Sequence, residues 1–339
     1  MSDDAVVIVN GARTAMGGFQ GSLSAVSAPE LGAASIREAV SRAGLKPEDV
    51  QEVIMGCVLP AGLKQGPARQ AMRLAGLPDN TGATTINKLC GSGMKATMFA
   101  YDSIKAGTND IVVSGGMESM TNAPYVLDKA RSGMRMGHGQ VYDHMFLDGL
   151  EDAETGRLMG SFAQEVADKR SISREDMDNY AIESLKRAQA AIDNGWFKDE
   201  IVPVTVKTRK GEVVVDTDEQ PGNANIDKIP TLRPAFAKDG TVTAANASSI
   251  SDGGSALVLA RESVANERGL KPLARILAHA TNSKHPSEFT IAPIGATEAV
   301  MKKAGWTVDD VALFEIHEAF ATVAMMPMID LATPHEKVN

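Results

Sequence analysis

The chain has 339 residues, carries a net charge of −9, and is 43% hydrophobic and 23% charged. A chain of this length and composition can bury the cores of two or three globular domains. The acidic balance excludes nucleic acid as the main partner, because phosphate contacts require clustered Lys and Arg. Only two cysteines occur, Cys57 and Cys90, which favours a reducing compartment over a disulfide framework.

The N-terminal residues 1–9 lack the basic start and the long apolar run of a secretory leader, and they are too acidic for a transit peptide. No stretch of the sequence approaches the length of a membrane span. We therefore expect a cytoplasmic protein with no membrane partner.

The first third of the chain alternates short apolar segments with segments of helical periodicity, and glycines close several of them. This alternation is typical of the α/β class, with a parallel or mixed sheet covered by helices. The expected strands are residues 6–10, 53–58, 83–89 and 110–114, and the expected helices are residues 28–43, 66–77 and 91–106.

The middle of the chain breaks this rhythm and has the character of a segment inserted between two core domains. One helix, at residues 174–194, and a charged hairpin, at residues 208–218, are expected there. Alternation then returns, with a strand near residues 273–280, a helix near 294–304 and a strand at 311–316.

An internal repeat links the two ends of the chain. Residues 43–56 and residues 304–317 both read as a helix end, an Ala-Gly cap, an acidic turn and a buried strand. The repeat favours a duplicated α/β half-domain, in which the ends of equivalent strands meet at the junction of the halves.

Cys90 is the strongest candidate for chemistry. The expected strand 83–89 delivers it to a turn, where Gly91 and Gly93 permit close backbone approach and unusual dihedral angles. The N-terminus of the following helix favours a thiolate and could stabilise an oxyanion. Free cysteines are often simply buried, but this context favours a nucleophile. Cys57, inside an apolar strand, is expected to be structural.

His317 is the second candidate, because it follows the expected strand 311–316. A histidine there could relay a proton or position a water, or it could only form a structural hydrogen bond. Glu318 either belongs to the same site or fits the first turn of a helix. The polar run 246–254 and the turn 115–120 either line a pocket or are ordinary loops.

The sequence has no metal-ligand spacing, phosphate-binding loop or dinucleotide-binding fingerprint, so we expect no metal. The remaining histidines are expected at the surface or in loops; they are His138, His144, His279, His285 and His335.

Six segments, in this order along the chain, resemble motifs of the thiolase family. The resemblance extends over essentially the whole chain, and it is to acetyl-CoA acetyltransferases and 3-ketoacyl-CoA thiolases. The segments are residues 10–17 (NGARTAMG), 87–96 (NKLCGSGMKA), 114–120 (SGGMESM), 232–236 (LRPAF), 246–253 (NASSISDG) and 317–321 (HEAFA).

The resemblance implies duplicated thiolase-type halves in αβαβα layers with an inserted loop domain. The implied domains are an N-terminal half at 1–120, a loop domain that binds CoA at 121–247, and an incomplete C-terminal half at 248–339. It also implies a homodimer or homotetramer in fatty acid metabolism, with coenzyme A thioesters as substrates and no separate cofactor.

By position in these motifs, the resemblance implies that Cys90 accepts the acyl group, with its N–H in an oxyanion hole, while His317 serves the thioester oxyanion. The implied reaction is reversible Claisen condensation or thiolysis of acyl-CoA. The implied CoA and substrate contacts are Ser248, Ala244, Phe236, Met159, Ala319 and Phe320.

The sequence departs from the family pattern at three points. The histidine of the Gly-His-Pro motif and the cysteine of the late Cys-x-Gly motif have no counterpart in these 339 residues. We therefore expect a chain that is C-terminally truncated relative to the family and that turns over slowly. Leu158 stands where short-chain enzymes of the family often carry a histidine. This difference weakens the expectation that the enzyme is strictly specific for acetoacetyl-CoA.

Three alternatives stay open beside an acetyl-CoA acetyltransferase. The first is a 3-ketoacyl-CoA thiolase of fatty-acid oxidation, and the second is a ketoacyl-carrier-protein synthase, although the inserted segment favours free CoA. The third is a non-catalytic thiolase-like scaffold.

Overall fold

The computed structural model describes residues 4–339. The expectation about the N-terminal residues 1–9 therefore lies partly outside the described residues. The described chain forms two compact units, and each is considered by itself. The first contains the residues up to Gly149, with Gly195–Gln220 and Ile250–Leu277; the second contains Leu150–Asn194, Pro221–Ser249 and Ala278–Asn339.

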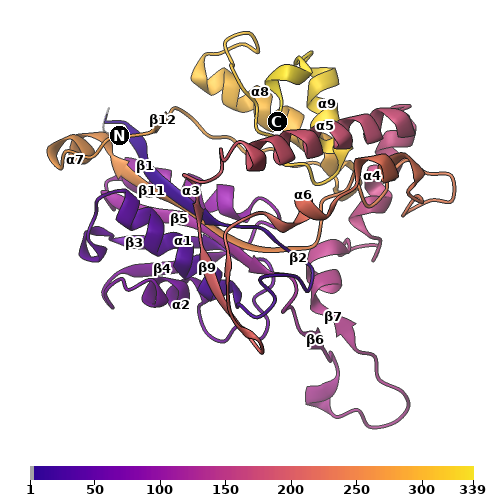
Figure 1. The fold of residues 1–339 in the computed structure, drawn as a ribbon, viewed down its shortest axis with the longest axis horizontal. Helices are drawn as coiled ribbons and strands as arrows, with labels where there is room; N and C mark the ends of the chain where they lie inside the picture. Colours follow the sequence, from indigo (N-terminus) through magenta and orange to yellow (C-terminus); the bar gives the residue numbers. More distant parts are fainter. Residues whose placement is uncertain (1–3) are drawn as a thin grey trace. The chain divides into compact units, whose positions relative to one another are not determined.

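The first unit is built on a mixed sheet in the order β12-β1-β11-β5-β3-β4 (Figure 1). Strands β3, β4 and β5 are parallel to one another, whereas β11 runs antiparallel between β1 and β5. Two short strands, β2 and β8, pair with β11 and β1. The bounds are β1 Val6–Thr14, β2 Gly17–Gly18, β3 Glu52–Gly56, β4 Gly82–Ile86, β5 Ile111–Ser119, β8 Ile201–Val202, β11 Ser251–Arg261 and β12 Ala274–Ile276.

Helices cover both faces of this sheet, because alternate strand residues are apolar on both sides. In β3, Val53 and Met55 face the core formed with helices α1 (Ala28–Arg42) and α2 (Pro67–Leu74). Ile54 faces the opposite side, where it packs with residues of α3 (Ser92–Ala106). The α/β class and the seven elements expected in the first third of the chain are therefore confirmed.

The rest of the first unit is less regular. Strands β9 (Val204–Thr208) and β10 (Gly211–Val215) form the hairpin expected from the charged segment. Shorter elements complete the unit or lie at its boundary: β6 Tyr125–Val126, β7 Tyr142–Asp143, the π-helical turn Phe146–Leu150, α6 Glu219–Asn223 and α7 Glu262–Glu267.

Strand β11 lies at the centre of the first sheet, although residues 248–339 were expected to form a separate half. Its register joins Val6 to Arg261 and Ile111 to Ala260. The domain boundaries at residues 120 and 247 stay a prediction. Strand β11 comes from the predicted C-terminal half, but it completes the sheet formed by strands of the predicted N-terminal half.

The second unit consists of helices and irregular segments. Its four α-helices are α4 Met159–Lys169, α5 Arg174–Asp193, α8 Ala292–Ala304 and α9 Ala321–Asp330. Ala163, Met177 and Ala324 are fully buried in its core. The expected helices at 174–194 and 294–304 are thus confirmed.

The prediction of a strand at residues 311–316 is wrong, since these residues form no strand. Phe314 makes only a single bridge to Val338. Three backbone hydrogen bonds join Phe314 and Ile316 to the terminal residues Lys337 and Asn339. The partner residues lie in or directly after the 3-10 turn His335–Lys337, which is not extended, and no ladder forms.

Candidate active site

Cys90 lies in a tight turn between the end of β4 and the start of α3. Gly91 N donates to Lys88 O at 3.1 Å, and Ser92 N donates to Leu89 O at 2.9 Å. The turn forces Leu89 to φ +49°, the left-handed region that costs an L-residue about 1–2 kcal/mol. The chain therefore reverses sharply just before the sulfur and leaves the Cys90 residue exposed.

The hydroxyl of Ser92 holds this turn closed. It accepts a hydrogen bond from Lys88 N at 2.8 Å and donates one to Leu89 O at 2.6 Å. Ser92 itself is buried, so both bonds are formed away from bulk water.

We expect Ser92→Ala to destabilise the chain by about 1–2 kcal/mol, because it leaves Lys88 N without its partner and removes one of the two hydrogen bonds to Leu89 O. Urea denaturation measures the change in free energy of unfolding. Ser132→Ala is the matched control: this exposed hydroxyl makes only a local bond to Lys129 O, so its free energy of unfolding should stay within about 0.5 kcal/mol of wild type. Equal losses in the two variants would contradict a role for Ser92 in the turn.

The glycines that this turn requires are not the ones expected from the motif. Gly91 has an ordinary φ of −86°, and a Cβ on Gly93 would meet its nearest atoms at 3.7 Å, a normal contact. A Cβ on Gly56 at the end of β3 would instead lie 2.6 Å from Ser92 Cβ. The close approach of β3 to the start of α3 therefore depends on Gly56, which the sequence motif does not contain.

The expected preference of Cys90 for the thiolate is wrong in this structure. Desolvation by the surrounding protein raises the pKa of Cys90, and the carboxyl of Glu118 raises it further. The backbone N–H of Cys90 acts in the opposite direction but does not prevail. Desolvation is the largest cause, and the Glu118 carboxyl contributes less than the opposing backbone hydrogen bond. Helix α3 begins only at Ser92, so Cys90 precedes the helix.

Glu118 and His144 were not singled out from the sequence as site residues. Glu118 lies in β5, and desolvation raises the pKa of its carboxyl. Hydrogen bonds from the backbone of Val58 and Leu59, together with nearby His144, lower this pKa but do not cancel the effect of desolvation. His144 is only 5% exposed and its Nδ1 lies 2.6 Å from Asp148 Oδ2, so the expectation of a surface or loop histidine is wrong. The sequence does contain a signal for this pair: His144 and Asp148 are four residues apart, the spacing at which side chains on one helical turn can contact each other.

Cys57 is buried, as expected for a structural cysteine. Its Sγ lies 3.5 Å from Glu118 Oε1. Burial, followed by the Glu118 carboxyl, raises the pKa of Cys57 to about 12. Both cysteines of the chain are therefore under the influence of one acid, but only Cys90 is exposed.

The remaining residues predicted for the site lie in the second unit. The rings of Phe236 and Phe320 meet edge to face, with centroids 6.3 Å apart. Ser248 N donates to Ala319 O at 2.9 Å. The structure thus brings Phe320 against Phe236, and Ala319 against Ser248, although these partners are far apart in sequence.

Met159 and Ala244 complete the predicted set in this unit. Met159 is half-buried at the start of α4. The next residue, Gly160, is essential for packing, because a Cβ there would lie 2.0 Å from the Phe236 ring. Ala244 and Ser248 are exposed at the surface of the unit.

His317 lies in an irregular segment that precedes α9, and the neighbouring Glu318 anchors this segment to α5. Glu318 accepts hydrogen bonds from Tyr180 Oη and Ser184 Oγ, both at 2.8 Å. Desolvation lowers the pKa of His317, against the opposing effect of Glu318. The imidazole is therefore neutral at neutral pH and can donate a single N–H bond.

Tyr180→Phe removes one of the two side-chain donors to the Glu318 carboxylate. We expect the free energy of unfolding to fall by about 1.5–3 kcal/mol, the usual contribution of a hydrogen bond to a charged group. Urea denaturation measures the loss. Ser184→Ala should cost a similar amount, and an unchanged midpoint in both variants would contradict the anchoring role.

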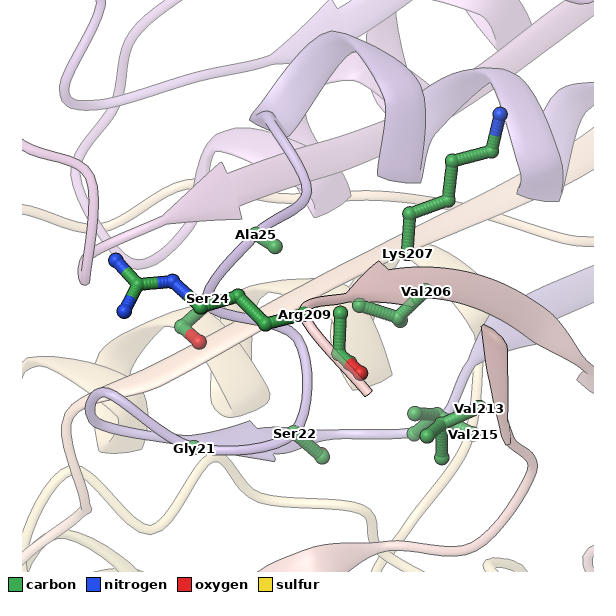
Figure 2. A pocket seen from close by; sticks show the side chains of 10 residues that line it. Gly21, Ser22, Ser24, Ala25, Val206, Lys207, Arg209, Val213 and Val215 are labelled. Atoms are coloured by element: carbon green, nitrogen blue, oxygen red, sulfur yellow. The ribbon is translucent and has the colours of Figure 1, made fainter. Parts of the chain in front are cut away.

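A hollow of about 490 Å³ lies elsewhere in the first unit, between the loop after β2 and the β9–β10 hairpin (Figure 2). Its lining includes three valines, Lys207 and Arg209 from the hairpin, and Ser22 and Ser24 from the loop. None of the predicted site residues borders this hollow.

Over residues 4–339, no group of three or more His, Cys, Asp and Glu side chains could hold a metal ion. In the same part of the chain, no helix has both the length and the apolar character needed to cross a membrane.

Comparison with known proteins places this architecture in one family. Residues 6–263 match the thiolase N-terminal domain, and residues 270–339 match the thiolase C-terminal domain. An acetyl-CoA acetyltransferase of Chromobacterium violaceum is 48% identical over 336 residues, which are 98% of this chain and 86% of the relative. One of Cupriavidus necator is 48% identical with the same coverage. A probable acetyl-CoA acetyltransferase of Dictyostelium discoideum is 47% identical over 99% of this chain and 81% of the relative.

The fold and these relatives define an acyltransferase of the α/β class. Within that class, the chain belongs to the thiolase family, and its function is that of a thiolase.

Proposed function

We propose that this thiolase transfers acetyl groups between coenzyme A thioesters, with acetyl-CoA as the donor and Cys90 as the acceptor. One observation carries the assignment of the acceptor: Cys90 is an exposed thiol in a strained turn just before the N-terminus of α3. The unpaired N–H groups at such a helix end can stabilise an oxyanion. The names of the curated relatives support the substrate.

In the first step, the Cys90 thiolate attacks the thioester carbonyl. The bond from the carbonyl carbon to the CoA sulfur breaks, and CoA leaves as a thiolate that takes up the proton lost by Cys90. In the second step, a second acetyl-CoA loses an α-proton, and its α-carbon attacks the carbonyl carbon of the acyl-cysteine. A carbon–carbon bond forms and the bond from that carbonyl carbon to the Cys90 sulfur breaks, so acetoacetyl-CoA is released. The sulfur leaves as a thiolate and takes up the α-proton, which restores the Cys90 thiol. Thiolysis runs the same steps in reverse.

We propose supporting roles for the residues of the second unit. The neutral His317 donates an N–H to the thioester oxyanion, and Ser248 hydrogen-bonds the pantetheine arm of CoA, beside Ala244. The half-buried Phe236 and Phe320, which meet edge to face, line the acyl pocket together with Met159 and Ala319. Their packing limits the length of the acyl chain.

Two measurements test this function. Intact-mass analysis after incubation with acetyl-CoA should show one acetyl adduct, and steady-state thiolysis should favour acetoacetyl-CoA over a long-chain 3-ketoacyl-CoA. Faster thiolysis of the long chain would instead identify a 3-ketoacyl-CoA thiolase. An adduct only from an acyl-carrier protein would point to a ketoacyl synthase. A folded chain without any adduct would be a non-catalytic scaffold.

We further propose that the protein forms a homodimer or homotetramer and acts in fatty acid metabolism in the cytoplasm. Strand β4 pairs only with β3, so its second edge is open within the described unit. Exposed apolar side chains lie in the turn after β4 and on α3: Leu89, Met94 and Phe99. Open edges and apolar patches of this kind are commonly covered by a second copy. Sedimentation velocity of the full chain measures the oligomeric state.

A further inference from the structure

Glu118 is a half-buried acid on the face of β5 that is turned toward the start of α3. Alternation along β5 places it on the same face as Gly116, whose Cβ direction meets Gly93 Cα at 3.4 Å. Gly116 is paired with Gly56, the last residue of β3. The carboxyl therefore lies just beyond the point where β3, β5 and the helix start come together.

The Glu118 carboxyl fixes the segment that follows β3. Its Oε2 accepts a hydrogen bond from Val58 N at 2.7 Å, and its Oε1 accepts one from Leu59 N at 3.1 Å. Cys57 Sγ lies 3.5 Å from the same Oε1. Two backbone donors on one carboxylate make a rigid clamp, because such charge-assisted bonds are stronger than neutral ones.

A chain of hydrogen bonds continues from this clamp to the turn of Cys90. Val58 O accepts a hydrogen bond from Asn87 Nδ2 at 3.4 Å. Asn87 Oδ1 in turn accepts one from Leu89 N at 2.9 Å. Leu89 is the strained residue that precedes Cys90, so Glu118 acts on the backbone that carries the sulfur.

Glu118 also determines the local charge. The titratable groups around it are the thiols of Cys57 and Cys90 and the imidazole of His144, which is itself bound to Asp148. An anion beside a thiol disfavours the thiolate.

We propose that Glu118 is a positioning residue for Cys90, whose carboxyl clamps the segment after β3 to the reactive turn and whose charge restrains formation of the thiolate. The role of Glu118 in acyl transfer rests on the proposed function of Cys90 as the acyl acceptor. The two effects are separated by two variants. Glu118→Gln removes the charge together with one of the two acceptor oxygens, whereas Asn87→Ala interrupts the hydrogen-bond chain and keeps the charge.

The charge is tested by alkylation of the full chain with iodoacetamide, which forms a thioether on the thiolate and releases iodide. Peptide mapping follows Cys90 separately from Cys57 across a range of pH. In Glu118→Gln the midpoint for Cys90 should fall below the wild-type value, while the desolvation that is the largest cause of the raised pKa stays in place. The alkylation rate at neutral pH should rise by at most about 3-fold, since a less basic thiolate is also a weaker nucleophile.

The clamp is tested by Asn87→Ala, which cuts the hydrogen-bond chain at an exposed residue and leaves the charge in place. Amide hydrogen exchange at Leu89 should become at least about 10-fold faster, while the alkylation midpoint of Cys90 stays at the wild-type value. Asn194→Ala, which removes an exposed side-chain amide that bonds Ala190 O at the end of α5, is the matched control and should change neither quantity.

Two results would overturn the proposal: a Glu118→Gln midpoint that coincides with wild type, or unchanged exchange at Leu89 in Asn87→Ala. If Glu118→Gln does not fold, the wild-type chain still decides the question of charge. A Cys90 midpoint below that of an ordinary free cysteine would then exclude a restraining anion. Alkylation needs no acyl-CoA, so a missing acetyl adduct would contradict the proposed function without affecting this result.

Discussion

Replacement of Cys90 by alanine is expected to abolish acyl transfer and to leave the fold intact. The thiol is the proposed acceptor of the acyl group, so its loss should reduce kcat by on the order of 10⁴-fold or more. Because Cys90 is exposed, the free energy of unfolding should change by less than about 0.5 kcal/mol. Intact-mass analysis with acetyl-CoA and urea denaturation measure the two effects.

Cys57→Ala is the matched control, since it removes the other thiol of the chain. Cys57 is 1% exposed and belongs to the main core of the first unit. Its truncation should cost about 1 kcal/mol of stability but should preserve the acetyl adduct. An adduct that persists in Cys90→Ala, or that disappears in a folded Cys57→Ala, would rule out Cys90 as the acceptor.

Gly115→Ala should have the largest effect on stability among the glycine substitutions considered. A Cβ at this position in β5 would lie 1.9 Å from Ser255 O, a backbone atom of the neighbouring strand β11. The two strands would have to separate in the middle of the sheet. We expect a loss of about 3 kcal/mol or more in the free energy of unfolding.

Gly82→Ala provides the control for this substitution in an edge strand of the same sheet. A Cβ there would meet its nearest atoms at 3.4–3.7 Å, and the stability should change by less than about 1 kcal/mol. Thermal and urea unfolding of both variants give the comparison. Equal stability of Gly115→Ala and Gly82→Ala would show that the close approach of β5 to β11 is not required.

Local sequence patterns predicted most of the fold of the first unit. Helix α1 was recognisable from apolar periodicity and the Gly44 that follows it, and this glycine has the left-handed φ of +69° expected after a helix. The expected strand at 311–316 failed because strand formation depends on a partner, which periodicity does not describe.

The candidate site was only partly predictable. Cys90 was found because its glycine-flanked motif is continuous in the sequence. Glu118, His144 and the segment after β3 come from three separate stretches, and only the pairing of β3 with β5 brings two of them together. The raised pKa of Cys90 was missed for the same reason, because the half-buried acid that contributes to it lies 28 residues further along the chain.

The position of β11 has a consequence for the order in which the chain can fold. Strands β1 and β5 cannot acquire their shared neighbour until residues 251–261 have been synthesised, more than 130 residues after β5 ends. Contacts of such large sequence separation slow folding and leave strand edges open in the meantime. A nascent chain released before Arg261 would therefore expose the edges of both strands, and such fragments should bind chaperones or aggregate.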